Sequence, residues 1–278
     1  MCIRDRSSLH YVATTRGSYM PDIDPKLHTL TIHGLVDQRL TLTMDDLKRF
    51  PSVTRLHFIE CAGNRHTPQQ KTVQETHGMT SCAEWTGVPL STLLKECGLK
   101  GGATWFVAEG AEEVKGASSM SISKAMDDCL IAYGMNGEPL RPQQGFPVRI
   151  IPPGFEGIFH TKYLRRIKIV DRYYMNYNEF GHLDREDKEA ALGYQIGPKS
   201  VITHPSGGQQ LPGRGFYEIK ATAQRMAHTR FGYGWNWDGN ETEILSRCTD
   251  EIGQEQPTRE QIAQYWNCLL YTSPSPRD

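Results

Sequence analysis

The stretch Phe58-Ile59-Glu60-Cys61-Ala62-Gly63-Asn64-Arg65 places one cysteine directly after an apolar strand pattern, in a Gly-Asn turn and beside an arginine. A nearby positive charge and small neighbouring residues favour a reactive or metal-binding thiolate. A single cysteine is, however, more often a small buried apolar residue. The stretch alone therefore leaves two interpretations of Cys61 open, a presented thiolate and a core thiol.

The two ends of the chain are expected to be translated sequencing adapter. Residues 1–6 can be encoded by one DNA word, and residues 268–273 can be encoded by the reverse complement of the same word. One word on opposite strands at both ends of a reading frame resembles a transposase adapter, and residues 274–278 continue it. We therefore exclude residues 1–6 and 268–278 from reasoning about the fold.

Composition excludes several classes of protein. The 278 residues carry a net charge of −1, without the polybasic surface that nucleic-acid binding requires. No apolar run reaches the about 18 residues that a membrane span needs. The cysteines between the ends lack short paired spacings, which favours neither a disulfide framework nor a zinc site, and no Cys-x-x-Cys-His haem attachment sequence occurs. These cysteines are Cys61, Cys82, Cys97, Cys129 and Cys248.

Patterns of strand and helix are mixed without a regular βαβ rhythm, which indicates an α+β fold. Thr43 is expected to cap a helix through Phe50, and Pro89–Cys97 has helical spacing and ends at Gly98. One helical turn is expected at Ser123–Asp128, and a tight turn at Asn136-Gly137. The expected strands are Leu30–Val36, Leu40–Leu42, Arg55–Glu60, Cys129–Tyr133, Phe146–Ile151 and Tyr163–Val170.

The amino-acid pattern changes after Val170. An aromatic and polar link comes first, and short strand patterns separated by glycine and proline follow it. This pattern is typical of a β-sandwich. We therefore expect one domain over residues 7–172 and a second, incomplete one over residues 173–267. The clearest strands of the second domain are Ser200–Thr203, Phe216–Thr222 and Glu243–Ser246.

Two groups of polar residues are candidates for chemistry. Arg149, His160 and Lys162 could hold a phosphate through charge-assisted hydrogen bonds, or could lie on solvated strand faces. Near Cys61, Arg65 offers a cationic fork for an oxyanion, or is a surface arginine. A site with one protein thiolate binds a metal better if another molecule supplies the remaining donors.

Other polar residues near these groups have simple structural explanations. His66 and His77 could be metal ligands, but solvated or core histidines are more common. Glu109, Glu112 and Glu113 form a local acidic cluster that a solvated loop explains.

Several motifs together resemble the sulfite oxidase family of molybdenum enzymes. The resemblance agrees in order and spacing and covers nearly all of residues 21–170. Its motifs are Cys61–Arg65, Ala83–Val88, Ala132–Leu140, Gly145–Arg149 and His160–Lys162. Within this family, Ser8–Arg16, Gln74–Thr80 and Lys199–Gly208 resemble the SoxC-like molybdenum subunits of bacterial sulfane or sulfite dehydrogenases.

The resemblance implies a fold, a cofactor and its ligands. The fold would be a molybdopterin-binding domain over residues 7–172, followed by a partial immunoglobulin-like domain that serves dimerisation in relatives. The cofactor would be Mo-molybdopterin, with Cys61 as the protein ligand of the metal. Gln144 stands where animal sulfite oxidases have a histidine, and its amide can still form hydrogen bonds. The other implied cofactor contacts are Glu112, Arg149, His160, Thr161 and Lys162.

The implied activity is oxidation of a sulfur substrate by oxygen-atom transfer, with electrons passed to a c-type cytochrome. Arg65 and Arg16 would form the catalytic cationic pocket that receives the anionic sulfur group. The substrate would be carrier-bound sulfane sulfur or a small sulfur anion such as sulfite. Free-sulfite dehydrogenase, sulfoxide reductase and a non-catalytic truncated homologue are the alternatives. Family habit implies a periplasmic location without nucleic-acid or membrane partners.

Two features depart from the family pattern. The active-site tyrosine column falls near Leu183, and Tyr173, Tyr174 and Tyr177 upstream of it are expected to form a structural aromatic belt. The second domain also loses several strands, because Thr222 is followed almost directly by Met226–Phe231. An incomplete sandwich exposes strand edges, so poor dimerisation or aggregation is expected.

Overall fold

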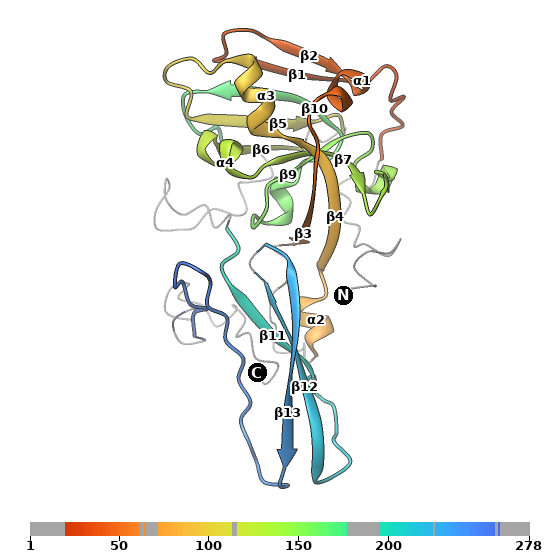
Figure 1. The fold of residues 1–278 in the computed structure, drawn as a ribbon, viewed down its shortest axis with the longest axis vertical. Helices are drawn as coiled ribbons and strands as arrows, with labels where there is room; N and C mark the ends of the chain where they lie inside the picture. The colour runs from red at the N-terminus through yellow and green to blue at the C-terminus, as the bar shows by residue number, and fades with distance from the viewer. Residues whose placement is uncertain are drawn as a thin grey trace.

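The computed structural model describes residues 20–61, 64, 72–112, 116–176, 195–224, 226–258 and 261. These residues form two regions that Figure 1 shows one above the other. We call residues 20–176 the first region and residues 195–258 the second region. The prediction of a domain boundary at residues 172 and 173 falls close to this division but is not tested by it.

In the upper sheet of the first region, the central strand is β10, the last strand of this region along the chain. The strand order is β2-β1-β10-β5-β6, and β1 runs parallel to β10 while the other pairs are antiparallel. Thr31 pairs with Arg166 and Ile32 with Ile167, so the ends of the region meet in this sheet. The strands are β1 (Thr29–Gly34), β2 (Leu40–Thr43), β5 (Trp105–Gly110), β6 (Ala117–Ser121) and β10 (Leu164–Val170).

The second sheet of the first region carries the strand that leads to Cys61. Its order is β3-β4-β7-β8, with β9 also paired to β7. Glu60 pairs with Thr80, so the loop that contains Cys61 begins and ends at neighbouring positions. Figure 1 shows the long β3 and β4 pair extending toward the second region. The strands are β3 (Val53–Glu60), β4 (Thr80–Pro89), β7 (Leu130–Met135), β8 (Glu138–Pro139) and β9 (Arg149–Ile151).

The helices are short, and local sequence signals fix their ends. Thr43 accepts a hydrogen bond from the Asp46 backbone amide, and the Asp46 carboxylate accepts one from the Thr43 backbone, which confirms the expected cap. Gly98 ends α3 with a φ of 65°, as predicted. The helices are α1 (Met44–Arg49), α2 (Val73–His77), α3 (Leu90–Cys97) and α4 (Ile122–Asp127), with 3₁₀ turns η1 (Pro142–Gln144) and η2 (Gly157–Phe159).

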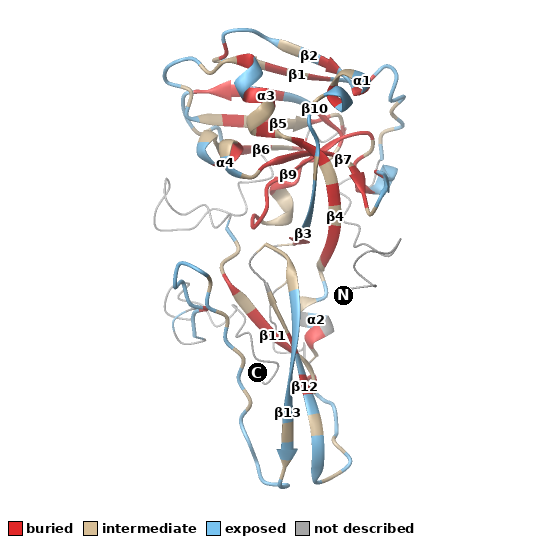
Figure 2. Cartoon of the chain, in the orientation of Figure 1, coloured by how far each residue is buried: buried red, intermediate tan, exposed pale blue. Residues whose placement is uncertain are grey.

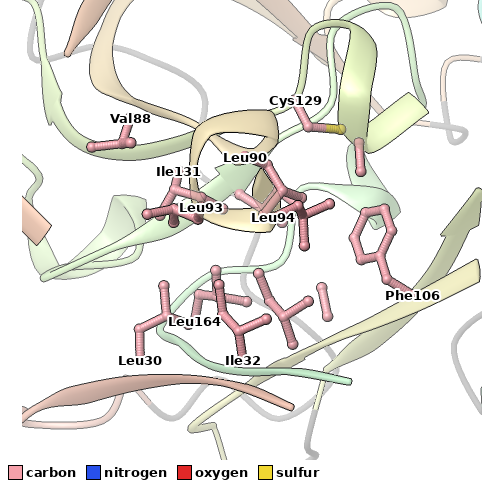
Figure 3. Close-up of a cluster of buried hydrophobic side chains, with 14 of the residues drawn as sticks. Leu30, Ile32, Val88, Leu90, Leu93, Leu94, Phe106, Cys129, Ile131 and Leu164 are labelled. Carbon is pink, nitrogen blue, oxygen red and sulfur yellow. The ribbon is translucent and has the colours of Figure 1, made fainter. Parts of the chain in front are cut away.

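The main core lies between the upper sheet and α3. Figure 3 shows the α3 leucines facing Leu30, Ile32 and Phe106. These side chains are almost entirely excluded from solvent. A smaller cluster lies under the second sheet around Trp85, whose indole Nε1 donates a hydrogen bond of 3.1 Å to the His57 carbonyl oxygen. The two clusters pack against the strands that lead to Cys61 and Arg149 and fix their positions.

The second region is a three-stranded antiparallel sheet in the order β11-β12-β13. Its buried core consists of Ile202, Ile219 and Ala221, and Figure 2 shows it far more exposed than the first region. The strands are β11 (Lys199–His204), β12 (Gly215–Gln224) and β13 (His228–Trp237). The second sheet of the expected sandwich is not confirmed, and the immunoglobulin-like assignment stays a prediction.

The largely sheet-based architecture agrees with the expected α+β class, but several expectations for single elements are wrong. Glu243–Ser246 does not form a strand and instead has irregular backbone structure. Glu109 does not lie in a solvated loop: it belongs to β5 and forms ion pairs with Arg165 and Arg166. No helix within the described ranges is long and apolar enough to span a membrane.

Candidate functional site

Cys61 lies directly after β3 and is half-buried. Its backbone amide donates a hydrogen bond of 3.0 Å to the Met79 carbonyl oxygen, and its own carbonyl oxygen accepts one of 3.0 Å from the Asn64 amide. The Asn64 side-chain oxygen in turn accepts a hydrogen bond of 2.8 Å from the Met79 amide. The two ends of the loop are thus tied together next to the cysteine.

A second segment, residues 157–162, packs against the strand end that leads to Cys61. A Cβ atom placed on Gly157 would lie 3.1 Å from the Glu60 carbonyl oxygen, so a larger residue would push the two backbones apart by a few tenths of an ångström. The segment continues into His160, Thr161 and Lys162. The fold therefore brings Cys61 close to the segment that carries the expected cofactor contacts, about a hundred residues later in the chain.

Arg149 is the most deeply buried cation in this part of the molecule, with 2% of its surface exposed. Its guanidinium donates hydrogen bonds of 2.9 Å to the Gln144 carbonyl oxygen and 3.0 Å to the His160 carbonyl oxygen, and lies 5.1 Å from the Trp85 ring centroid. Its Nε has no hydrogen-bond partner among the described residues. Burial lowers the pKa of Arg149 to about 9. Its interpretation as a solvated surface residue is therefore wrong.

His160 is buried and presents one nitrogen without a partner. Its Nε2 lies 3.1 Å from the Phe155 carbonyl oxygen, and a carbonyl can only accept, so Nε2 carries the proton. Burial, together with the charge of Arg149, lowers the pKa of His160 well below its ordinary value. The ring is therefore neutral, and Nδ1, which has no partner among the described residues, is left as an acceptor.

Thr161 and Lys162 complete the segment. The Thr161 hydroxyl lies 3.0 Å from the hydroxyl of Ser118 in β6, and the Lys162 ammonium donates a hydrogen bond of 2.7 Å to the Gln143 carbonyl oxygen. Burial, and then the charge of Arg149, lower the pKa of Lys162 to about 7, although Glu112 opposes this shift. Gly145 has a φ of 99° and would place a Cβ 2.8 Å from the Lys162 Cβ, so glycine is needed to seat the lysine.

Gln144 and Glu112 also lie at this site. Gln144 is 3% exposed, and its carbonyl oxygen fixes the Arg149 guanidinium. Glu112 is buried and close enough to Lys162 to act on its charge. The structure therefore brings together Gln144, Arg149, His160, Thr161, Lys162 and Glu112 as expected.

The charges of this cluster fit an anionic ligand. Arg149 is buried and Lys162 is half-buried, and the charge of Arg149 acts on Lys162, so two cationic side chains lie at one site. A phosphate accepts hydrogen bonds from several donors and brings the negative charge that neighbouring cations favour. The partnerless Arg149 Nε and His160 Nδ1 add one donor and one acceptor, which suits a group with both phosphate and pterin functions.

The metal-ligating side chains near Cys61 are also consistent with a cofactor that brings its own sulfur donors. No group of three or more His, Cys, Asp or Glu side chains that could hold a metal occurs among the residues that the structure describes. Cys61 can therefore serve as a metal ligand here if a cofactor supplies the other sulfur donors.

Some sequence expectations fall outside the described residues, namely those for Arg16, Arg65, His66, Tyr177 and Leu183. His77 ends α2, away from any described cluster of metal-ligating side chains. Tyr173 packs edge-on against Trp105 at 5.3 Å between ring centroids, as a structural aromatic would. Ser118 and His57 carry no recognisable sequence signal, because Ser118 lies in β6, which has no clear strand pattern, and a histidine inside a strand belongs to no motif.

Comparison with known proteins agrees with this chemistry. Residues 17–178 match the family described as "Oxidoreductase molybdopterin binding domain". A nitrate reductase [NADH] of Hordeum vulgare is 33% identical over 95% of this chain and 32% of its own length, and nitrate reductase [NADH] 1 of Oryza sativa subsp. japonica is 34% identical over 84% and 28%. The chain thus spans about a third of the length of these curated relatives.

A solved structure is similar over most of both chains. The sulfane dehydrogenase SoxCD from Paracoccus pantotrophus superposes with a TM-score of 0.77 and 31% identity, covering 90% of this chain and 74% of the other. The family match covers more than half of the chain, and its residues include the whole cluster around Cys61 and Arg149. The chain therefore belongs to the sulfite oxidase family of molybdenum enzymes, and its cofactor is Mo-molybdopterin.

Proposed function

We propose that this chain is the molybdenum subunit of a sulfane or sulfite dehydrogenase, an oxidoreductase acting on sulfur donors. The observation that carries the proposal is the similarity to SoxCD, which extends over 90% of the chain and so includes both regions. The nitrate reductases share similar identity but place the chain only in the wider family of molybdenum oxidoreductases. Nitrate reduction is therefore the second candidate.

The residues of the site have distinct roles in this proposal. Cys61 supplies the protein thiolate of the metal. Arg149 and Lys162 hold the phosphate, and His160 and Thr161 orient the pterin through the acceptor nitrogen and the hydroxyl described above. Gln144 and Glu112 fix the two cations in position. When bound, the cofactor supplies oxygen-atom transfer and storage of two electrons, while the chain provides binding and orientation.

The substrate pocket is proposed from sequence positions that the structure does not describe. Arg65, four residues after Cys61, and Arg16 are the candidates for the cations that receive an anionic sulfur group. Electrons would leave to a c-type cytochrome, because the chain has no haem attachment sequence of its own. A sulfur-carrier protein and a periplasmic location belong to the same proposal, whereas the shortened second domain is proposed to dimerise poorly.

Molybdenum content tests the assignment of Cys61. Purified protein should hold about one molybdenum per chain, and Cys61→Ser should lose most of it, since the protein would then offer no thiolate to the metal. Cys248→Ser is the matched control, because Cys248 is also half-buried but lies in the second region. Full molybdenum in Cys61→Ser would contradict the role of Cys61. A folded wild type without metal would favour the non-catalytic alternative.

Substrate kinetics test the reaction. Sulfite, a carrier-bound sulfane group and nitrate should be compared with the same loaded preparation and an artificial electron acceptor or donor. Oxidation of one of the two sulfur substrates is expected, with kcat/KM at least about a hundredfold above that for nitrate, a difference of about 2.7 kcal/mol in transition-state stabilisation. Faster turnover of nitrate would overturn the proposal in favour of the second candidate.

A further inference from the structure

The second region contacts the loop around Cys61 at several separate points. The loop leaves β3 at Glu60 and returns to β4 at Thr80, and both positions are bound by side chains from β11 and β13. We infer that Lys199 and His228 are positioning residues that set the direction of Cys61 toward the metal. The inference rests on the proposed function, in which Cys61 is the metal ligand.

The first contact is an ion pair at the residue before Cys61. Lys199, at the start of β11, donates to the Glu60 carboxylate, and both partners are largely buried. Removing one partner of a buried pair leaves an uncompensated charge, which costs far more than the loss of a surface pair. The carboxylate would then move toward water, and because Glu60 adjoins Cys61, the cysteine backbone would move with it.

The second contact lies on the neighbouring strands. His228, at the start of β13, stacks on Phe58 with ring centroids 5.4 Å apart and an interplanar angle of 17°. Its Nε2 also lies 3.2 Å from the Thr80 hydroxyl, at the point where the loop returns to β4. The Phe58 amide donates a hydrogen bond of 3.2 Å to the Met226 carbonyl oxygen. One histidine thus links both strands that flank the loop.

The third contact reaches the loop itself. The Ser206 hydroxyl accepts a hydrogen bond of 3.0 Å from the amide of Val73, the first residue of α2. Both residues are buried, so water does not compete for this bond. Entry, helix and return of the Cys61 loop are therefore each bound by the second region.

The second region also supports the opposite side of the site. Ile196 donates a backbone hydrogen bond of 2.7 Å to Gly154, and Gln195 forms a β-bridge with Phe155. Phe155 provides the carbonyl that fixes the His160 ring. The second region thus contacts both the Cys61 loop and the segment that fixes His160, so a region without expected cofactor ligands can act on the site.

The test compares Lys199→Met with Lys220→Met. Lys220 is the matched control. It forms an ion pair with Glu218 in the second region, and both members of that pair are exposed. In cofactor-free protein, Lys199→Met should speed hydrogen exchange of the peptide covering residues 72–80 by at least about tenfold, while Lys220→Met should leave it unchanged. Lys199→Arg should restore protection, since it keeps the positive charge. Equal exchange in all three variants would overturn the inference.

A spectroscopic readout separates positioning from general stability. In molybdenum-loaded protein, Lys199→Met and His228→Phe should shift the Mo(V) electron paramagnetic resonance g values, because the direction of the thiolate changes. His228→Phe keeps an aromatic ring stacked on Phe58 and removes the hydrogen bond to Thr80. Unchanged g values in both variants would overturn the inference. Loss of molybdenum in Cys61→Ser remains the separate test of the proposed function, so the two can fail independently.

Discussion

The two regions differ in the size of their buried hydrophobic cores. The first region packs two sheets and α3 around a continuous core in which many large side chains, such as Phe106 and Leu93, are fully buried. The core cluster of the second region consists of just three buried residues, Ile202, Ile219 and Ala221, under a single sheet. A three-stranded sheet with so small a core is close to the lower limit of independent stability. The first region therefore carries the site, while the second depends on its contacts with the first.

Removal of a large core side chain should produce the largest effect and should be confined to the first region. Phe106→Ala leaves a cavity between the upper sheet and α3, and we expect a loss of about 3–5 kcal/mol in the free energy of unfolding. Peptide-resolved hydrogen exchange in increasing urea would measure it. If peptides of β12 lost protection by the same amount, the two regions would unfold as one unit and the contrast drawn above would be wrong.

Acid should destabilise the first region through its buried histidines. Burial, aided by Arg55 and Lys124, lowers the pKa of His57 to about 4, against about 6.5 when unfolded. The unfolded chain then binds more protons, so the stabilisation is complete above about pH 6.5 and is lost as the pH falls toward 4, on the order of 3 kcal/mol. Urea titrations from pH 7.5 to 4.5 would measure it.

The variant His57→Phe isolates the contribution of this histidine. It should flatten the acid limb only partly, because His160 is buried with its pKa lowered in the same direction. Parallel stability curves for wild type and variant would contradict the assignment. The hydrogen bond from Trp85 should persist in the variant, since it is made to the backbone carbonyl of residue 57.

The smallest effect is expected in the second region. Ile219→Ala removes one of its three core residues, and we expect a loss of about 2 kcal/mol, at the lower end for such a change, because half-exposed neighbours such as Trp235 can close over the gap. Exchange of β12 peptides would report it. A loss as large as that of Phe106→Ala would show that the small core is packed as tightly as the large one.

Elements with local signals could be predicted from the sequence. Thr43 and Gly98 mark helix ends through chemistry that acts within one turn, and Asn136 and Gly137 both adopt positive φ in the predicted tight turn. The helix α2 was missed although Thr72 and Glu75 form a capping box, because the surrounding residues are polar.

Elements whose stability comes from distant partners could not be predicted in the same way. β4 is buried on both faces around Trp85, so its sequence lacks the alternation that marks a half-buried strand. Glu243–Ser246 carries two apolar residues, Ile244 and Leu245, but does not lie in the three-stranded sheet of the second region. Strand pairing, rather than local pattern, decided both cases.

The contacts of the candidate site also divide into those that a local sequence motif predicts and those that depend on distant partners. Ordered motifs pointed to Cys61, Arg149 and His160, and the structure places these segments side by side. The ion pair between Glu60 and Lys199 carried no sequence signal, since its partners are 139 residues apart and belong to different regions. Such contacts depend on how the regions dock, which no local pattern encodes.

The parallel pairing of β1 with β10 has a consequence for the newly made chain. Thr31 cannot meet Arg166 until the ribosome has released the whole first region, and at about 5–20 residues per second this interval is on the order of ten seconds. During that time β1 has only β2 as a neighbour, and an isolated hairpin is marginally stable in water. We therefore expect Leu30 and Ile32 to remain accessible to chaperones throughout this interval.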